Sequence, residues 1–306
     1  MRALKASNGT DMMLWSFIAA VVLYGFMVPL QSSQPPQSPP SAQSDSAGSA
    51  QAAPAESNAA ANELARNVVK NELKAMDEDH SHWMYRLETV EHGAKETKEV
   101  VETKDGDVTR LVERNGQPLS PDEQKAEDEQ MDKFIHDPAE QKKQQQDVAD
   151  DSRKMKQLLG MLPEALTYSA PEVSGSTTKL KFQPNPAFHP PSREAHVFHE
   201  MEGELVVDTK QQRIVEFSGH LIHTVDFGGG LLGHLDQGGT FDVRQQEVGP
   251  GIWEMTLLKV NMKGKALFFK TVSVQQDERH SDFHRVPDTE TLAQAEDMLR
   301  KQVALK

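Results

Sequence analysis

The chain has 306 residues, 37% of them hydrophobic, and its 33 basic and 47 acidic side chains give a formal net charge of −14. This acidic balance disfavours a DNA or RNA partner, because phosphate binding needs a basic face. The absence of cysteine excludes disulfides, thiol catalysis and thiolate metal sites. The length is sufficient for one sizeable globular domain or two small ones.

The N-terminus carries a long apolar segment. Residues 12–30 contain no charged side chain, and Arg2 and Lys5 precede them, whereas no basic residue follows before Arg66. A helix of this length reaches about 28 Å, roughly the thickness of the hydrocarbon core of a bilayer. The pattern predicts that residues 1–30 are an inner-membrane anchor or a cleaved signal peptide, and it favours the anchor. Either alternative places the remaining chain in the periplasm or cell envelope.

Residues 31–60 consist mainly of Pro, Ser, Gln and Ala, a composition that predicts a disordered linker. Beyond it, the sequence predicts one α+β domain over residues 61–306. The domain begins with a helix over 62–80, followed by a three-stranded meander in which Asp105-Gly106 marks one hairpin turn.

A polar helical insertion is predicted over about 116–165. Ser120 and Glu123 have the spacing of a capping box, with a proline between them at the first helical position. The insertion becomes apolar only at 155–166. This apolar segment is either a flap over a groove or the anchor of the insertion.

The C-terminal half, about 166–277, has the alternating pattern of an antiparallel sheet with one buried and one solvated face. A long hairpin is predicted to begin near His196 and to turn at 208–211. Strands at about 240–248, 251–262 and 265–277 follow, and a C-terminal helix begins after Pro287.

Gly228, Gly230 and Gly233 match the G-x-G-x-x-G spacing of a dinucleotide-binding turn. Such a turn needs a helix after the third glycine and a βαβ unit around it. Here a strand pattern resumes by Thr240, and the neighbouring strands form antiparallel hairpins. We therefore expect these glycines to permit a sharp bend between strands, with no nucleotide cofactor.

The 12 histidines raise the question of a metal site. His196 and His199 are predicted to lie on a strand, where their spacing points them to opposite faces, and His220 and His223 have the same spacing.

His280 and His284, with Asp282 between them, form a weak metal-site hypothesis in a polar segment; the alternative is that they are solvent-exposed. The sequence contains no H-E-x-x-H, G-x-S-x-G or Walker A motif. It predicts a protein that is not an enzyme and has no catalytic residues, metal or cofactor.

Two segments carry a resemblance to a family. The strand–turn–strand "GELVVDTKQQRIVEFSGHL" at 203–221 and the strands "GIWEMTLLKVNMKGKALFFKTVSV" at 251–274 resemble those of the bacterial lipoprotein-sorting carriers (LolA/LolB-like proteins). The resemblance implies an unclosed β-barrel wrapped around helices, with an apolar concave face that accepts acyl chains. It also makes Arg86 a candidate for the family's inward-facing arginine.

The predicted fold is α+β, a curved antiparallel β-sheet (an unclosed half-barrel) with helices packed on its concave side. The predicted function is non-enzymatic binding of a hydrophobic ligand, such as a lipid or a lipoprotein acyl chain. The alternative is an anchored structural or protein-interaction module whose helices fill the concave face and leave no cavity. The residues predicted to line the ligand site, besides Arg86, are Val197, Met201, Leu205, Val207, Val215, Phe217, Leu221, Val225, Trp253, Met255, Leu257, Leu267 and Phe269.

Overall fold

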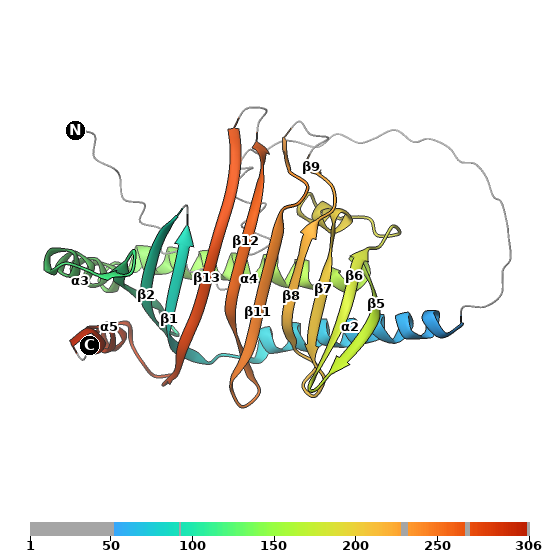
Figure 1. Cartoon of the computed structure of the whole chain (residues 1–306). Helices are drawn as coiled ribbons and strands as arrows, with labels where there is room; N and C mark the ends of the chain where they lie inside the picture. Colours follow the sequence, from blue (N-terminus) through green and yellow to red (C-terminus); the bar gives the residue numbers. More distant parts are fainter. Residues whose placement is uncertain (1–51, 92, 228–231, 267–269, 305–306) are drawn as a thin grey trace.

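The computed structural model describes residues 52–91, 93–227, 232–266 and 270–304 (Figure 1). The predicted anchor or signal segment and most of the predicted linker lie outside these ranges, as do Gly228 and Gly230. Residues 52–60, assigned to the linker by composition, form the first turns of helix α2, because alanine has the highest helix propensity. Among the described residues, no helix is long and apolar enough to cross a membrane.

The elements in chain order are α2 (Ala52–Glu78), β1 (His82–Glu91), β2 (Ala94–Thr103), β3 (Gly106–Arg114), β4 (Gln117–Pro118), α3 (Pro121–Ile135), α4 (Pro138–Ala165), β5 (Leu166–Ser174), β6 (Thr177–Pro184), the 3₁₀ helix η1 (Glu194–Glu200), β7 (Met201–Asp208), β8 (Ile214–Leu221), β9 (Val225–Phe227), β10 (Gly233–Leu235), β11 (Thr240–Gly249), β12 (Ile252–Ala266), β13 (Lys270–Val286) and α5 (Leu292–Ala304).

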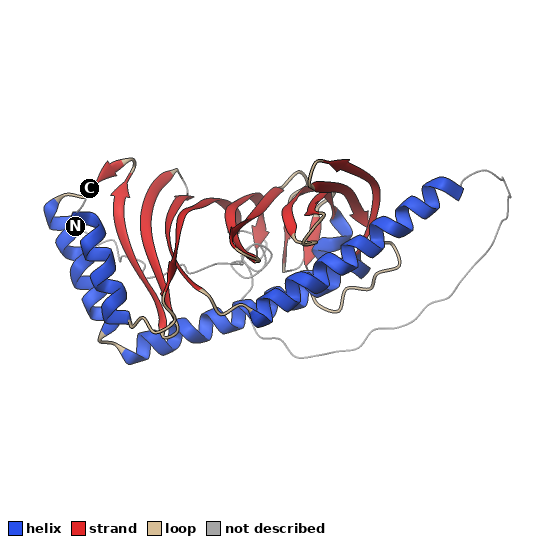
Figure 2. Ribbon diagram, turned by 90° about the horizontal axis from the view of Figure 1, so that it is seen from below, coloured by secondary structure: helices blue, strands red, loops and turns tan. Residues whose placement is uncertain are grey.

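One antiparallel sheet of 13 strands forms the body of the molecule, in the order β4-β3-β2-β1-β13-β12-β11-β8-β7-β6-β5, with β9 and β10 attached beside β12. β4 and β5 lie at opposite edges, so the sheet is not closed into a barrel. The chain passes from one edge to the other through α3 and α4. Figures 1 and 2 show α4 running across the strands. The predicted α+β class with a large open antiparallel sheet is confirmed.

Local signals in the sequence account for several of these elements. The capping box of α3 is formed, with the Ser120 side chain accepting from the backbone N–H of Glu123 and the Glu123 side chain accepting from the backbone N–H of Ser120. Asp105 lies in the turn between β2 and β3, as predicted for this hairpin. Gly233 opens strand β10 with φ of 139°, and strand β11 begins at Thr240, as the strand pattern predicted.

Two expectations about histidines were wrong. Residues 194–200 form a 3₁₀ helix instead of a strand, so the argument that His196 and His199 point to opposite faces of a strand does not hold. This helix packs the apolar side chains of Val197 and Phe198 into the main hydrophobic core. β13 extends to Val286 because its residues from Gln276 onward pair with β1, and it buries His280. The expected exposure was therefore wrong for His280, whereas His284 is exposed.

Helices pack on both faces of the sheet. The main apolar cluster joins α2 and α4 to one face, here called the inner face, which carries Leu205 and Phe217. A second cluster includes Met84 of β1, together with Met131 of α3 and Leu299 of α5. Tyr85, the next residue along β1, belongs to a third cluster, and neighbouring strand residues face opposite sides. α3 and α5 therefore cover the outer face near β1–β3, an additional layer that the sequence did not predict.

Candidate functional site

A cavity of about 510 Å³ lies where the last turns of α2, the middle of α4, the β2–β3 hairpin and the start of β12 meet. We call this cavity the acidic pocket. Its carboxyl groups include Glu102, Asp107 and Glu254, and its apolar walls include Met76 and Trp253. The β2–β3 hairpin brings Glu102 and Asp107 together, because the two residues are directly paired across it.

A buried ion pair forms one border of the acidic pocket. The Nε atom of Arg213 donates to Oε1 of Glu72 at 3.0 Å and its Nη2 atom donates to Oε2 at 2.9 Å. The backbone N–H of Ile214 adds a bond of 2.7 Å to Oε1. The Arg213 guanidinium also lies 5.8 Å from the centre of the Trp253 ring. Because Arg213 binds both carboxylate oxygens of Glu72 in this way, its charge is already compensated.

The backbone around Asp107 is fixed by α4. The Gln144 side chain accepts from the Asp107 N–H at 3.0 Å and donates to the Asp107 carbonyl at 3.1 Å. On the other strand of the hairpin, Glu102 accepts from the backbone N–H of Trp83 at 3.0 Å. The Gln144 bonds therefore fix the backbone of Asp107, and the Trp83 bond holds the Glu102 carboxylate at the pocket wall.

Burial makes these acids unusually hard to ionise. Removal from water raises the pKa of Asp107 to about 7, against a hydrogen bond from the Thr103 backbone that lowers it. Burial, with a further contribution from the negative charge of Asp79, raises the pKa of Glu254 to about 7, against the positive charge of Arg213, which lowers it. Burial and then the charges of Asp107 and Glu254 raise the pKa of Glu102 well above its ordinary value. The dominant cause in each case is desolvation of the charged form.

None of these three carboxyls forms an ion pair with a basic side chain in the described parts of the chain. Lys104 is the basic residue beside them on the hairpin. Its Nζ atom pairs with Oδ2 of Asp105 at 3.2 Å. Within the described ranges, no hydrogen bond joins the three carboxyls to a hydroxyl or imidazole group. The arrangement is therefore suited to receiving a positive charge, and it lacks an activated nucleophile.

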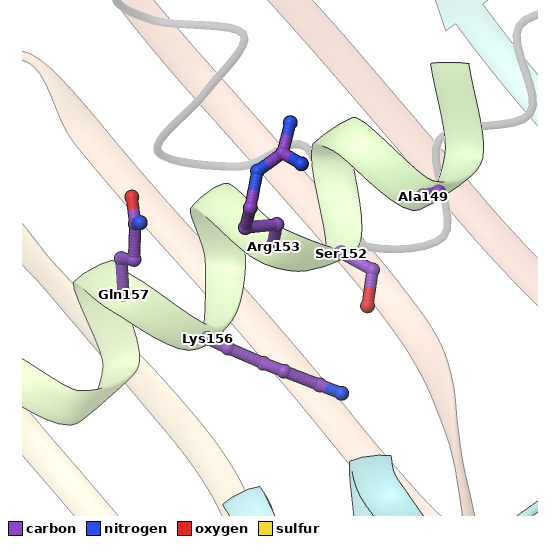
Figure 3. Close-up of a pocket in the computed structure, with 5 residues that line it drawn as sticks. All are labelled: Ala149, Ser152, Arg153, Lys156 and Gln157. Atoms are coloured by element: carbon purple, nitrogen blue, oxygen red, sulfur yellow. The ribbon is translucent and has the colours of Figure 1, made fainter. Parts of the chain in front are cut away.

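The acidic pocket continues along α4 into a hollow of about 560 Å³ lined by Ala149, Ser152, Arg153, Lys156 and Gln157 (Figure 3). Arg153 and Gln157 project from one side of the helix, and Ser152 and Lys156 project from the other. Arg153 pairs with Asp150 and Lys156 pairs with Asp77 of α2. These basic groups are likewise engaged by neighbouring acids.

Most of the residues predicted to line a ligand site are buried in the main apolar cluster. This cluster contains Val197, Met201, Leu205, Val207, Phe217, Leu221, Val225 and Met255, together with side chains of α2 and α4.

Three other predicted lining residues lie elsewhere. Leu257 is buried outside the main apolar cluster, and Val215 and Trp253 are half-buried. A β-bulge between β7 and β8 pairs Ile214, instead of Val215, with Val207. Of the three, Trp253 lines the acidic pocket.

The side chains of Leu267 and Phe269 lie outside the described residues.

Arg86 lies next to Tyr85 in β1, and strand alternation therefore directs it to the outer face. Its Nε and Nη2 atoms donate to the Glu99 carboxylate at 3.1 and 2.7 Å.

His280 is almost completely buried, at 6% exposure, and stacks on Tyr85 with ring centroids 5.1 Å apart. His284 is exposed. No group of three or more histidine or acidic side chains within the described ranges could hold a metal ion.

Sequence reasoning missed Glu102, Asp107 and Glu254, because the alternation of a strand does not distinguish an acid on a solvated face from one that lines a pocket. The hairpin signal near Asp105 places Glu102 and Asp107 on neighbouring strands. A turn at Asp105-Gly106 would pair Glu102 with Thr109, whereas the observed turn at Lys104-Asp105 pairs Glu102 with Asp107.

The fold and the pocket define an α+β protein with an open antiparallel sheet and a carboxyl-rich cavity beside its helices. No model of a known protein family matches the sequence, and no curated protein does. Among solved structures, the chain is similar to a DUF1329 family protein from Desulfovibrio piger ATCC 29098, with 10% identity and a TM-score of 0.28 over 79% of this chain and 99% of the other. A likeness of this degree carries no argument about relationship or function.

Proposed function

We propose that this chain is an exported, non-enzymatic binding protein of the cell envelope and that its ligand occupies the acidic pocket. The observation that carries the proposal is a cavity of about 510 Å³ whose walls combine apolar side chains with carboxyls that, within the described ranges, lack ionic partners. Pockets with apolar walls and a few convergent polar groups are the usual sites of small ligands. The apolar segment 12–30 supports export and attachment to the inner membrane.

The apolar inner face of the sheet is a less favourable place for this ligand. Val68 of α2 and Leu158 of α4 pack into the main apolar cluster with 0% and 5% exposure. A lipid or acyl chain on this face would have to displace both helices and expose the side chains they cover. The open antiparallel sheet nevertheless agrees with the architecture implied by the resemblance to lipoprotein-sorting carriers, and we propose distant kinship with them on that basis.

The test is native mass spectrometry of the full chain purified from a bacterial host. We expect an excess mass that organic extraction removes. Replacement of the half-buried Ala75, which lines the pocket, by Trp should abolish it, whereas Ala139→Trp on an exposed position of α4 should not. If the Ala75→Trp variant retained an acyl ligand, the binding site would lie on the inner face instead. If the original chain showed no excess mass, ligand binding would be contradicted.

The packed inner face also favours a second candidate function, an anchored structural or protein-interaction module. In this case α2 and α4 would serve only to complete the core. Crosslinking of the full chain in cells would then give a specific protein partner, and the Ala75→Trp variant would keep that partner.

A further inference from the structure

We infer that the ligand of the acidic pocket is an organic cation, an ammonium group joined to a short apolar chain. The inference rests on the proposed function and specifies the chemical class of the ligand. It follows from the charges around the cavity, from its apolar wall and from the geometry of its acidic groups.

Asp107 lines the cavity and is only 6% exposed. Its carboxylate has the Thr103 backbone as hydrogen-bond partner and no basic partner within the described ranges. Glu102 and Glu254 line the same cavity, and neither forms an ion pair with a described residue. A buried acid without a counter-charge is costly, and a cation that enters beside it removes that cost.

The protein supplies no free cation for this purpose within the described residues at the pocket. Arg213 is held against both carboxylate oxygens of Glu72. Lys104, which also lines the pocket, is paired with Asp105, and their side chains are 57% and 47% exposed. The ring of His82, another lining residue, lies 3.5 Å from the Asp288 carboxylate. The positive charge must therefore come with the ligand.

The apolar wall determines what accompanies the charge. Ala75 and Met76 of α2, Val148 of α4 and the Trp253 indole contribute apolar surface to the cavity. The indole is fixed by a hydrogen bond of 3.0 Å from its Nε1 to the Gln211 side chain. Indole rings attract cations as well as apolar groups. The same wall therefore suits an alkyl chain that ends in an ammonium group.

The alternatives fit less well. The three carboxyls would repel an anion such as a fatty acid. A bare metal ion needs converging ligands, and no group of three suitable side chains lies close enough within the described ranges. A lysine side chain of a partner protein and a free alkylamine present the same ammonium group, so both belong to the inferred class.

The test is calorimetric titration of the full chain at about pH 8 with hexylammonium chloride. Ammonium chloride, hexanol and sodium hexanoate separate the contributions of charge and chain. We expect hexylammonium to bind at least about tenfold more tightly than hexanol. Asp107→Asn and Glu254→Gln should each weaken it by about tenfold, and Asp105→Asn, the neighbouring half-exposed acid, should leave it unchanged. Circular dichroism confirms that each variant folds.

The outcomes separate this inference from the proposed function. If hexanol or hexanoate bound as tightly as hexylammonium, and Ala75→Trp blocked that binding, the inference of a cationic ligand would be overturned. The pocket would remain the binding site. Equal weakening by Asp105→Asn would also overturn the inference, because the effect would then be one of general charge. Absence of binding by every probe, together with a clean native mass, would overturn the inference and the proposed function together. Binding of a lysine-containing peptide at least about tenfold more tightly than hexylammonium would favour the partner-protein source, and weaker binding would favour a free alkylamine.

Discussion

Replacement of Asp107 by Asn should stabilise the protein at neutral pH, because it replaces a buried ionisable carboxyl by a neutral amide. Asn keeps an oxygen that accepts from the Thr103 backbone, and it has a similar size. It differs in carrying no charge, and burial disfavours the charged form of Asp107 strongly enough to raise its pKa from 3.8 to about 7.

The sign of the pH dependence follows from this raised pKa. In the unfolded chain Asp107 loses its proton near pH 3.8, whereas in the folded protein it keeps the proton until about pH 7. The folded state thus binds more protons between these values, so stability falls as pH rises through that window. A tenfold change in an acid dissociation constant corresponds to about 1.4 kcal/mol, and the loss of folding free energy at pH 8 amounts to about 4 kcal/mol at most. We expect about 2–4 kcal/mol, since relaxation and water penetration reduce the penalty.

The assay is urea unfolding followed by tryptophan fluorescence between about pH 4.5 and 8, because Trp83 and Trp253 lie near the pocket. The original chain should lose stability as pH rises, and Asp107→Asn should lose less, becoming the more stable protein at pH 8. The control is Asp105→Asn, because the Asp105 side chain is 47% exposed. This variant should show the same pH dependence of stability as the original chain. An Asp107→Asn variant with the original pH slope, or one less stable than the original at pH 8, would refute the reasoning.

Three further predictions test other parts of the structure by chemical denaturation. Arg213→Met should cost about 3–5 kcal/mol because it leaves Glu72 charged and buried, and Glu72→Gln in the same chain should restore part of the loss; no recovery would contradict the ion-pair account. Gly160→Ala in α4 should stabilise by up to about 1 kcal/mol, since the added methyl meets only Leu73 at 3.9 Å; a loss would indicate tighter packing there. Ser120→Ala should cost about 1 kcal/mol through loss of the α3 cap, and Ser120→Asp should keep most of the original stability; equal losses in the two variants would show that the cap is not the cause.

The local elements of this protein follow from short stretches of its sequence. The capping box at Ser120 and Glu123 starts α3, and Lys104-Asp105-Gly106 turns the β2–β3 hairpin. The alternation of Leu205 and Val207 identifies the buried face of β7. These features depend on interactions between residues close together in the chain, and for this reason the open antiparallel sheet with helices was predictable.

Other features depend on contacts between distant segments. The pairing of β13 with β1 extends β13 through a polar sequence and buries His280, which no local pattern predicts. The bulge that turns Ile214 inward in place of Val215 depends on how β8 pairs with β7.

The sequence by itself determined the fold class, the existence of the β2–β3 hairpin, and the apolar side chains of the sheet. Only the tertiary structure decided that α2 and α4 cover those side chains and that the cavity lies beside them, among carboxyls. Glu254 reaches this cavity from a strand far along the chain, and Glu72 and Arg213 meet at its border across 141 residues. The physical reason is desolvation: an acidic residue has the same sequence signature on a wet surface and in a pocket, and only the packing of distant elements removes its water.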